Sequence, residues 1–308
     1  MINIAFEGGL GNQMFQYVYA RYLEEKFQEP VKYDVSKYKF EANECRNFEL
    51  QSFNIRKEWQ PCKLNKNRFL RFGPGYGVYL LVTAPYIRIN NKRKKQGKNY
   101  IGSSLYQKII NTFGFYRVHY GEYEEPNKSL SKTKYVRGHW FWTDLVQRMD
   151  HIVREELRVI TPVSIDNQEI LDQMKVANSV GVHIRRGDYV QLGLVICDIA
   201  YYTRCMKKMT ELVDNPTFFV FSDDIPWVKE NLKPPYNVVF VDNNNSAPED
   251  MRLLYSCNHF IMSNSTFSWW GAYLGDCPDK KVIVPEIWSK GGKKSKLILE
   301  DWIVEKTI

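Results

Sequence analysis

The sequence feature that most constrains the fold is a series of five short, mainly apolar runs in the second half of the chain. Runs of this kind are typical of parallel strands that are covered on both faces. Stretches with helical periodicity fill the gaps between them, and repeated alternation of strand and helix predicts a doubly wound α/β sheet. The expected strands are 179–184, 217–221, 238–241, 259–262 and 281–284.

The first half begins in the same way, with a strand, a glycine-rich turn, a helix and another strand. This order favours a parallel sheet, because βαβ crossovers are right-handed. From about residue 48 to 135 the periodicity is poor, and residues such as Pro85 predict breaks in regular structure. We expect an N-terminal domain over 1–160 and a C-terminal domain over 161–308. The expected elements of the first half are strands at 2–6 and 31–33 and a helix at 12–27.

Helix signals in the second half are clear at several places. The stretches 145–157 and 201–213 have helical periodicity. Ser246 and Glu249 have the spacing of a capping box, with Pro248 in the first turn of the helix that they begin. These helices complete the doubly wound pattern.

Positive charge is concentrated in one part of the sequence. Between Arg56 and Lys134 there are 17 Lys and Arg against 4 Glu, a balance of +13, whereas the whole chain has a net charge of +8. The run at 92–98 suits an anionic membrane surface, a polyanion or a phosphate-bearing substrate. A solvated loop is the plain alternative.

No apolar run approaches the ~18 to 20 residues that a membrane-spanning helix needs. The first residues lead into a glycine turn and not into the apolar region of a signal peptide. We therefore expect a cytoplasmic location, with peripheral contact at the inner face of an anionic membrane left open.

Polar loops follow the expected strands of the second half, where ligands bind in an open α/β sheet. The first loop contains Arg185 and Arg186. Two guanidinium groups beyond a buried strand can clamp a diphosphate, because each matches phosphate oxygens with a planar fork of donors. The alternative is a salt-bridge network with Asp188. His183 is either a satisfied core histidine or part of the same site, and its place beside the arginines favours the site.

The loops after the other strands carry further polar groups. Asp223 and Asp224 are expected to diverge, so that one carboxylate meets the nucleoside or a loop amide while the other caps the following helix. Ser265, Thr266 and Ser268, with the amides that open the next helix, can hold phosphate oxygens.

The glycine-rich turn at 8–13 lacks the GxGxxG spacing of a dinucleotide site, which disfavours an oxidoreductase. It is either a tight strand-to-helix turn or a backbone that approaches a ligand closely.

Metal ligands are not evident in the sequence. No Asp-x-Asp triad follows an expected strand, and no His or Cys pair has the spacing of a metal site. We therefore expect a metal-independent site, in which the arginine pair stabilises charge that develops on a leaving phosphate.

Four segments are distinctive when they are taken together. They read Gly-Gly-Leu-Gly-Asn-Gln-Met-Phe-Gln-Tyr at 8–17, His-Ile-Arg-Arg-Gly-Asp-Tyr at 183–189, Phe-Ser-Asp-Asp at 221–224 and Ser-Asn-Ser-Thr-Phe-Ser-Trp-Trp-Gly-Ala at 263–272. In this order they resemble the bacterial α-1,2-fucosyltransferases of glycosyltransferase family eleven, over nearly the whole chain.

The resemblance implies a GT-B fold, in which two Rossmann-like domains face each other across a cleft. The N-terminal domain would bind the acceptor and the C-terminal domain the GDP-sugar. The implied activity is inverting transfer of L-fucose from GDP-β-L-fucose to a galactose hydroxyl, as in a galactoside 2-α-L-fucosyltransferase. The acceptor would be an oligosaccharide or a lipid-linked glycan precursor of O-antigen or capsule, and no cofactor or metal would be required.

The resemblance also implies roles for individual residues. The catalytic group would be Arg185, His183 and Asp188. The donor-binding group would include Asn12, which approaches from the opposite domain, and a set in the C-terminal half: Arg185, Arg186, Ser222, Asp223, Ser265, Thr266 and Phe267.

The segment Gly-His-Trp-Phe-Trp-Thr-Asp at 138–144 departs from the family's usual pattern. We assign four of its side chains to the acceptor, because aromatic rings stack on sugars. Carboxylates are the usual general base, and a loose transition state needs little help from one. The acceptor candidates are His139, Trp140, Trp142 and Asp144, and the candidate bases are Asp188, Glu7 and Asp144.

Two other functions stay open. A glycosyltransferase could use another GDP-sugar or a UDP-sugar, because arginines recognise the diphosphate and leave the base and the sugar to other contacts. A nucleic-acid-binding protein would account for the positive charge and the many aromatic residues. The polar loops lie in the less basic half, however, so we expect no nucleic-acid partner.

Overall fold

The computed structural model describes residues 1–36, 38, 47–56, 75–96, 98, 103–117, 132–289, 292 and 295–307. The chain divides into two compact units. Unit 1 consists of Met1–Gly9, Phe15–Phe48 and Arg56–Phe141, and unit 2 of Leu10–Met14, Glu49–Ile55 and Trp142–Ile308. This division differs from the expected boundary near residue 160, since it falls after Phe141 and assigns two earlier segments to unit 2.

Unit 1 is built on a parallel sheet with the strand order β2-β1-β4-β3. Because β1 and β2 are parallel and joined by α1, the expected βαβ unit is confirmed. The elements are β1 (Ile2–Ala5), α1 (Leu10–Phe27, whose first residues belong to unit 2), β2 (Val31–Asp34), α4 (Gly75–Lys95), α5 (Ser103–Thr112), β3 (Phe115–Arg117) and β4 (Lys134–Arg137).

Helix α4 passes through Pro85, where the sequence predicts a break. That prediction is wrong for this stretch. Pro85 lies on the exposed side of the helix, and tyrosines on the other side stack on neighbouring rings, Tyr79 on Phe115 and Tyr86 on Tyr106. Fully burying a large apolar side chain contributes about 1.5–3 kcal/mol, so the buried Tyr76 and the partly buried Tyr79 and Tyr86 together offset the roughly 3 kcal/mol that an interior proline costs.

Unit 2 contains the larger sheet and most of the helices. Its elements are η1 (Leu50–Ser52), α6 (Thr143–Arg148), α7 (Asp150–Glu156), α8 (Ile165–Val176), β5 (Asn178–Ile184), α9 (Gly187–Gln191), α10 (Ile199–Leu212), β6 (Pro216–Ser222), α11 (Ile225–Asn231), β7 (Asn237–Phe240), α12 (Ala247–Tyr255), β8 (His259–Ile261), α13 (Thr266–Leu274), β9 (Val282–Pro285) and β10 (Ile303–Glu305).

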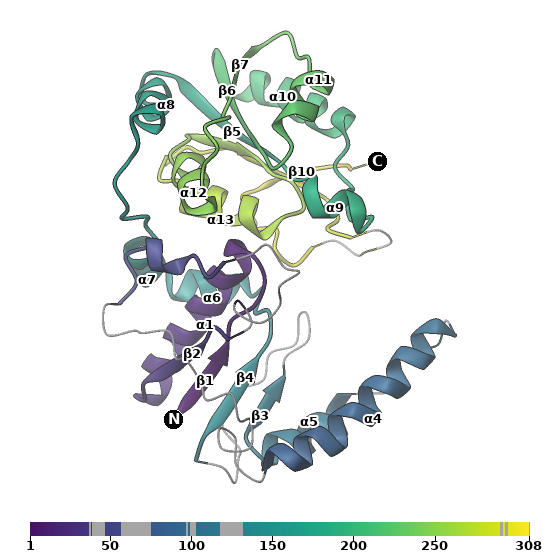
Figure 1. Cartoon of the computed structure of the whole chain (residues 1–308). Coiled ribbons are helices and arrows are strands. Elements are labelled where there is room, and N and C mark those ends of the chain that lie inside the picture. Colours follow the sequence, from purple (N-terminus) through teal and green to yellow (C-terminus); the bar gives the residue numbers. More distant parts are fainter. Residues whose placement is uncertain are drawn as a thin grey trace. The chain divides into compact units, whose positions relative to one another are not determined.

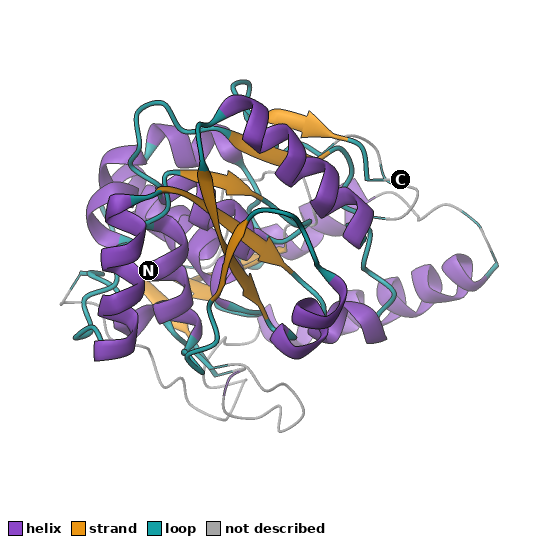
Figure 2. Ribbon diagram, turned by 90° about the horizontal axis from the view of Figure 1, so that it is seen from above, coloured by secondary structure: helices purple, strands orange, loops and turns teal. Residues whose placement is uncertain are grey.

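The sheet of unit 2 has the strand order β10-β9-β8-β5-β6-β7, and every pairing is parallel. Counted from β5 as the first strand, the order is 6-5-4-1-2-3, the doubly wound order in which the chain reverses direction between β5 and β8. The five expected strands are confirmed, and β10 is an additional one. Helices α10 and α11 lie on one side of this sheet and α12 and α13 on the other (Figure 1), and strands in orange run between helices in purple (Figure 2).

The core of unit 2 explains why these runs form a covered sheet. Val182 of β5 and Tyr202 of α10 belong to one buried apolar cluster. On α13, Trp269 and Trp270 are both fully buried, and the indole N–H of Trp270 donates to the carbonyl oxygen of Gly11 at 2.9 Å. The buried tryptophans therefore anchor α13 in the core of unit 2. The N-terminus of this helix lies at the edge of the sheet.

Two helix predictions need correction. The stretch 145–157 forms two helices, α6 and α7, that are separated at Met149. Ser246 is the N-cap residue of α12, but its side chain makes no capping hydrogen bond. Glu249 accepts instead from the hydroxyl of Thr161 and lies 3.3 Å from Arg252. The prediction of a capping box is therefore wrong, because the Glu249 side chain binds Thr161 and Arg252 instead.

Candidate functional site

The carboxyl ends of β5 and β8 meet where the strand order of unit 2 reverses, which is where doubly wound sheets bind ligands. A cavity of about 490 Å³ opens at this edge, and the loops after β5, β6 and β7 line it together with the start of α13. Its volume is within the usual range for small-molecule sites. Five expected site residues line the cavity: His183, Arg185, Ser222, Asp223 and Phe267.

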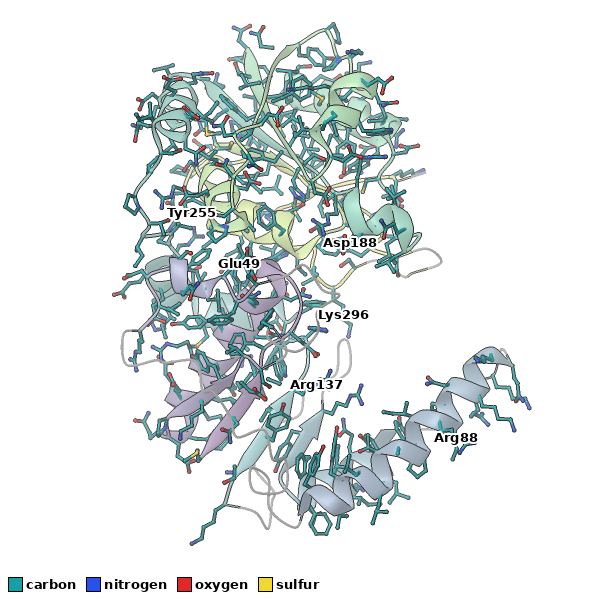
Figure 3. All side chains as sticks on the ribbon, in the orientation of Figure 1. Glu49, Arg88, Arg137, Asp188, Tyr255 and Lys296 are labelled. Atoms are coloured by element: carbon teal, nitrogen blue, oxygen red, sulfur yellow. The ribbon has the colours of Figure 1, made fainter. Side chains whose placement is uncertain are left out.

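Arg185 is the arginine that borders the cavity. Its Nη2 donates to Oδ1 of Asp188 at 2.6 Å, and its Nη1 lies 2.8 Å from Oδ2 of Asp223. Asp188, labelled in Figure 3, belongs to α9. The salt-bridge alternative is therefore realised in this structure. It does not exclude ligand binding, because a guanidinium has five N–H donors and the side chain is 25% exposed.

Asp223 connects the two arginines. Its Oδ2 meets the Arg185 guanidinium, and its Oδ1 accepts a hydrogen bond from the backbone N–H of Arg186 at 2.8 Å. A Cβ atom on Gly187 would collide with this carboxylate. Glycine at position 187 therefore lets the carboxylate approach the loop.

Arg186 is held beside the cavity and is not one of its lining residues. Its Nε donates to Oδ2 of Asp224 at 3.0 Å, and its Cζ lies 3.2 Å from the ring centroid of Trp227. Asp224 also accepts from the backbone N–H of Trp227 and caps α11. The prediction that the two aspartates diverge, one to a loop amide and the other to a helix cap, is confirmed.

Carboxylates outnumber guanidinium groups in this cluster. Two arginines face Asp188, Asp223 and Asp224, which gives a formal charge of 2 − 3 = −1. A diphosphate that binds Arg185 must therefore exchange partners with carboxylates. Among the residues that the structure describes, no group of three or more His, Cys, Asp or Glu side chains is placed to hold a metal ion.

His183 lies near the carboxyl end of β5, with its side chain buried. Its Nδ1 is 2.6 Å from Oγ of Ser268 and 3.1 Å from Oγ of Ser263. Burial and the nearby charge of Arg185 lower the pKa of His183 to about 3, so the ring is neutral near pH 7. Both alternatives for this histidine apply, since it is hydrogen-bonded in the core and also lines the cavity.

The start of α13 is held by the first turn of α1. Ser265 caps α13 by accepting from the N–H of Phe267, and Thr266 donates to Oδ1 of Asn12 at 3.0 Å. A Cβ atom on Gly11 would lie 2.6 Å from the Phe267 nitrogen, so this approach requires glycine. Asn12 belongs to the same unit as Thr266, whereas the resemblance implies an approach from the opposite domain.

The cavity also has an acidic end, whose carboxylates are not among the site residues expected from the sequence. Asp242 and Asp250 line it together with the asparagines at 243–245. Burial raises the pKa of Asp250 to about 6, and Asn245 donates to its Oδ1 at 3.0 Å. Asp242 forms an ion pair with Lys229 at 2.7 Å. A polar run directly after a strand marks Asp242, whereas no sequence signal marks Asp250 on its helix.

Two acceptor candidates, His139 and Trp140, belong to unit 1. The Trp140 ring is 3% exposed and stacks on Tyr19 with 4.2 Å between centroids, so here it is part of the core and not an exposed platform for a sugar. Nε2 of His139 lies 3.6 Å from Oε1 of Glu7. Oε2 of Glu7 accepts from Arg137, labelled in Figure 3, at 2.8 Å. This candidate base is therefore already paired with a cation.

The other two acceptor candidates, Trp142 and Asp144, belong to unit 2. Trp142 is the N-cap residue of α6, and the guanidinium of Arg148 lies over its ring at 5.8 Å. Asp144 is exposed in the first turn of the same helix, where the helix dipole favours a carboxylate. The candidates in this segment are thus divided between the two units.

A doubly wound sheet with a cavity at the carboxyl ends of its strands, bordered by an arginine, is an arrangement suited to a phosphate-bearing ligand. The sequence model described as "Glycosyl transferase family 11" matches residues 1–306. The chain therefore belongs to glycosyl transferase family 11 and is a glycosyltransferase.

Two proteins from Escherichia coli are similar over nearly the whole chain. The O-antigen biosynthesis glycosyltransferase WbnK is 30% identical, over 96% of this chain and 97% of its own. An alpha-1,2-colitosyltransferase is 32% identical, over 91% of this chain and 90% of its own. Human galactoside alpha-(1,2)-fucosyltransferase 1 is 34% identical over 40% of this chain and 38% of its own.

One solved structure supports the fold. The NodZ alpha-1,6-fucosyltransferase soaked with GDP-fucose matches 88% of this chain and 91% of its own, with 15% identity and a TM-score of 0.50. Together with the two parallel sheets, this likeness confirms the expected α/β fold of the GT-B type.

Proposed function

We propose that this glycosyltransferase is an inverting α-1,2-fucosyltransferase. It moves L-fucose from GDP-β-L-fucose to a galactose hydroxyl of an oligosaccharide or lipid-linked glycan, and it requires no metal. The observation that carries the proposal is the position of Arg185 on the wall of a cavity at the switch point of the sheet, in a chain of this family. The fucosyl group and the galactose acceptor are supported by the name of one relative, the human galactoside alpha-(1,2)-fucosyltransferase 1.

Arg185 is the proposed contact to the GDP diphosphate. Its guanidinium exchanges the carboxylates of Asp188 and Asp223 for phosphate oxygens, which accept from the same planar fork. Asp188 and Asp223 orient the guanidinium before the donor arrives. Arg186 supports the loop from outside the cavity through Asp224. Fixed arginine charge supplies the stabilisation that a metal ion gives in other phosphate sites.

His183 is the proposed neutral donor to the same phosphate group. When Nδ1 accepts from the Ser268 hydroxyl, the proton of the neutral ring lies on Nε2. That N–H can donate to a phosphate oxygen at the cavity without adding charge. Ser222 and Phe267 complete this part of the lining. The start of α13 is held in place by Ser265, Thr266 and Asn12. We propose that these three residues also contact the donor.

The acidic end of the cavity is the proposed guanine site. Guanine presents the N1–H and N2 amino donors side by side, and one carboxylate can accept both. Uracil presents a single N–H on the corresponding edge. Asp242 and Asp250 both line the cavity, so the lining is better matched to GDP than to UDP.

The proposed reaction is a direct displacement. The acceptor oxygen forms a bond to C1 of fucose while the bond from C1 to the GDP oxygen breaks, which inverts the anomeric configuration. The bonding electron pair passes to the β-phosphate, where Arg185 stabilises the charge. The hydroxyl proton leaves to a carboxylate, with Asp144, Glu7 and Asp188 as the candidates. The proposed acceptor contacts are the less buried side chains of the segment 138–144, namely His139, Trp142 and Asp144, and not the buried Trp140.

A second donor follows from one relative. A chain of similar length that is 32% identical to this one is an alpha-1,2-colitosyltransferase. Colitose is a deoxy relative of fucose, so the same diphosphate and base contacts would serve either donor. Comparison of kcat/KM for GDP-fucose and GDP-colitose separates the two activities.

Calorimetry in the presence of EDTA tests the donor site. Wild-type protein should bind GDP in preference to UDP, ADP and a short DNA duplex, and Arg185→Ala should lose most of that binding. Arg204→Ala is the matched control, because Arg204 pairs with Glu305 and does not line the cavity. Equal binding of the three nucleotides, or a preference for DNA, would overturn the proposal.

Product analysis tests the chemistry. Incubation of GDP-fucose with a terminal β-galactoside in EDTA should give an α-1,2 linkage, identified by NMR of the product. A retained β configuration would rule out the inverting mechanism, and activity that appears only after Mg²⁺ or Mn²⁺ is added would rule out metal independence.

A further inference from the structure

Helix α4 lies in a stretch of the chain that carries only positive charge. From Gly75 to Arg117 the sequence contains no Asp or Glu and eight Lys or Arg. Five of these cations lie toward the C-terminal end of α4. The eight are Arg88, Lys92, Arg93, Lys94, Lys95, Lys98, Lys108 and Arg117.

The two sides of α4 differ in what they contact. One side packs into an aromatic cluster, where Tyr79 stacks on Phe115 and Tyr86 stacks on Tyr106 at 4.0 Å between centroids. Helical geometry therefore turns the residues halfway around the helix away from unit 1's core. The outer side of α4 thus consists of the residues that do not pack into the aromatic cluster.

The outer side of α4 combines cations with aliphatic side chains. Arg88, Lys92 and Lys95 follow Leu81 at intervals of seven, four and three residues, which keeps them on one side of the helix. All four side chains are exposed, and Arg88 is labelled on α4 in Figure 3. Leu81 is 76% exposed, and Leu80 and Ile89 flank the row at 40% and 47%. We call these residues the α4 face: Leu80, Leu81, Arg88, Ile89, Lys92 and Lys95.

We propose that the α4 face binds the surface of an anionic lipid bilayer. Its leucines and isoleucine would enter the boundary between headgroups and acyl chains, and its cations would meet lipid phosphates. Long Lys and Arg side chains can keep their charge at the headgroups while their stems cover apolar surface. Within the described part of the chain no helix is long and apolar enough to cross a membrane, so α4 would lie on the bilayer.

Charge and side-chain type favour lipid over two other partners. Single-stranded nucleic acid is bound by aromatic rings that stack on bases, and the tyrosines at 79 and 86 are packed inward instead. A second copy of the chain that used its own α4 face across a two-fold axis would bring six cations, three from each copy, into one contact. Like charges oppose that contact. An anionic bilayer complements both the cations and the exposed aliphatic groups.

Vesicle co-sedimentation tests the proposal without donor or acceptor, so its result is independent of the proposed function. Wild-type protein should bind vesicles of phosphatidylglycerol and phosphatidylcholine, and should bind phosphatidylcholine alone far more weakly. Each cation near the surface contributes roughly a five-fold factor to binding, so Arg88→Gln/Lys92→Gln/Lys95→Gln should lose about 100-fold. Lys175→Gln/Lys207→Gln/Lys233→Gln is the matched control, with the same change in net charge at exposed positions of unit 2.

Two further measurements keep the proposal open to contradiction. Leu81→Gln/Ile89→Gln should weaken vesicle binding while leaving all cations in place, and high salt should release the wild-type protein. Equal loss in the control triple variant, or full binding by the α4 triple variant, would overturn the proposal. It would also fail if a DNA duplex competed and Leu81→Gln/Ile89→Gln changed nothing, or if these two substitutions converted a dimer to a monomer.

Discussion

Arg185 and Asp223 join the carboxyl ends of neighbouring strands, with Nη1 of the arginine 2.8 Å from Oδ2 of the aspartate. The aspartate reaches this position because residue 187 has no side chain to collide with it. The ion pair therefore depends on a glycine that itself offers no group to a ligand. Substitution of Gly187 therefore tests how the Arg185 guanidinium is positioned while the arginine itself stays in the chain.

We expect Gly187→Ala to weaken GDP binding about ten-fold, equivalent to about 1.4 kcal/mol. The added methyl group displaces the Asp223 carboxylate, which orients the Arg185 guanidinium before GDP arrives, so GDP binding must then also fix the position of this side chain. Position 187 is exposed at the start of α9, so Tm should change little. Calorimetry and thermal melting check the two parts. Unchanged GDP affinity would show that the Asp223 contact does not position Arg185.

The stability of the protein in acid should report on the neutral ring of His183. The pKa of this histidine is about 3 in the folded chain and ordinarily about 6.5. Between these values the unfolded chain takes up a proton that the folded chain does not. The free energy of unfolding therefore falls as pH is lowered through this window, by up to about 1.4 kcal/mol per pH unit.

His183→Gln should remove this part of the acid slope in urea unfolding measured from pH 4 to 7. His151→Gln, at an exposed position of α7, is the control for replacing a histidine outside the cavity. If the His183 variant kept the full wild-type slope, the ring would have to be protonated in the folded protein.

Asp250 should give the opposite trend. Burial raises its pKa from an ordinary value near 3.8 to about 6, so the folded chain keeps a proton that the unfolded chain has lost. Its contribution to stability is complete below pH 3.8 and is lost as pH rises through 6. If the carboxylate accepts from guanine, GDP binding favours the ionised form. GDP affinity should then increase from pH 5 to 7, and binding near pH 6 should release a proton.

Calorimetry in two buffers with different ionisation enthalpies measures that proton. Asp250→Asn should abolish the release and reduce the preference for GDP over UDP. Asp242→Asn is the companion variant, since Asp242 also lines the cavity and is paired with Lys229. Proton release that persists in Asp250→Asn would assign the titration to another group.

Two neighbouring tryptophans should behave differently when they are replaced. Trp140→Ala should lower the free energy of unfolding by about 3–5 kcal/mol, because the ring is buried against Tyr19. Trp142 is only half-buried, so Trp142→Ala should cost less than about 1 kcal/mol and, if it contacts the acceptor, raise the acceptor KM. Urea unfolding and acceptor kinetics compare them. Similar losses of stability in the two variants would contradict this distinction.

The strands of unit 2 could be predicted from the sequence because parallel strands covered on both faces leave continuous apolar runs. Helix α4 could not, because Pro85 predicts a break and only packing of the tyrosines against α5 and β3 compensates for it. Strand β10 is only partly buried and includes Glu305, so it does not leave a continuous apolar run in the sequence.

The candidate site divides in the same way. Arg185 could be predicted because it directly follows a strand. Its carboxylate partners could be named only in part, since the choice between Asp223 and Asp224 depends on the loop conformation around Gly187. Asp250 reaches the cavity from a helix face, and the burial of Trp140 depends on α1, so both require the fold in three dimensions.

The way α1 is divided limits how this protein can be recombined with its relatives. The helix begins with five residues that belong to unit 2 and continues in unit 1, and a second short segment of unit 2, Glu49–Ile55, comes later. No single cut in the gene therefore separates the units. A hybrid made with one crossover between these segments would take Gly11 and Phe267 from different parents, so a design that keeps this close contact must transfer Leu10–Met14 together with the C-terminal part.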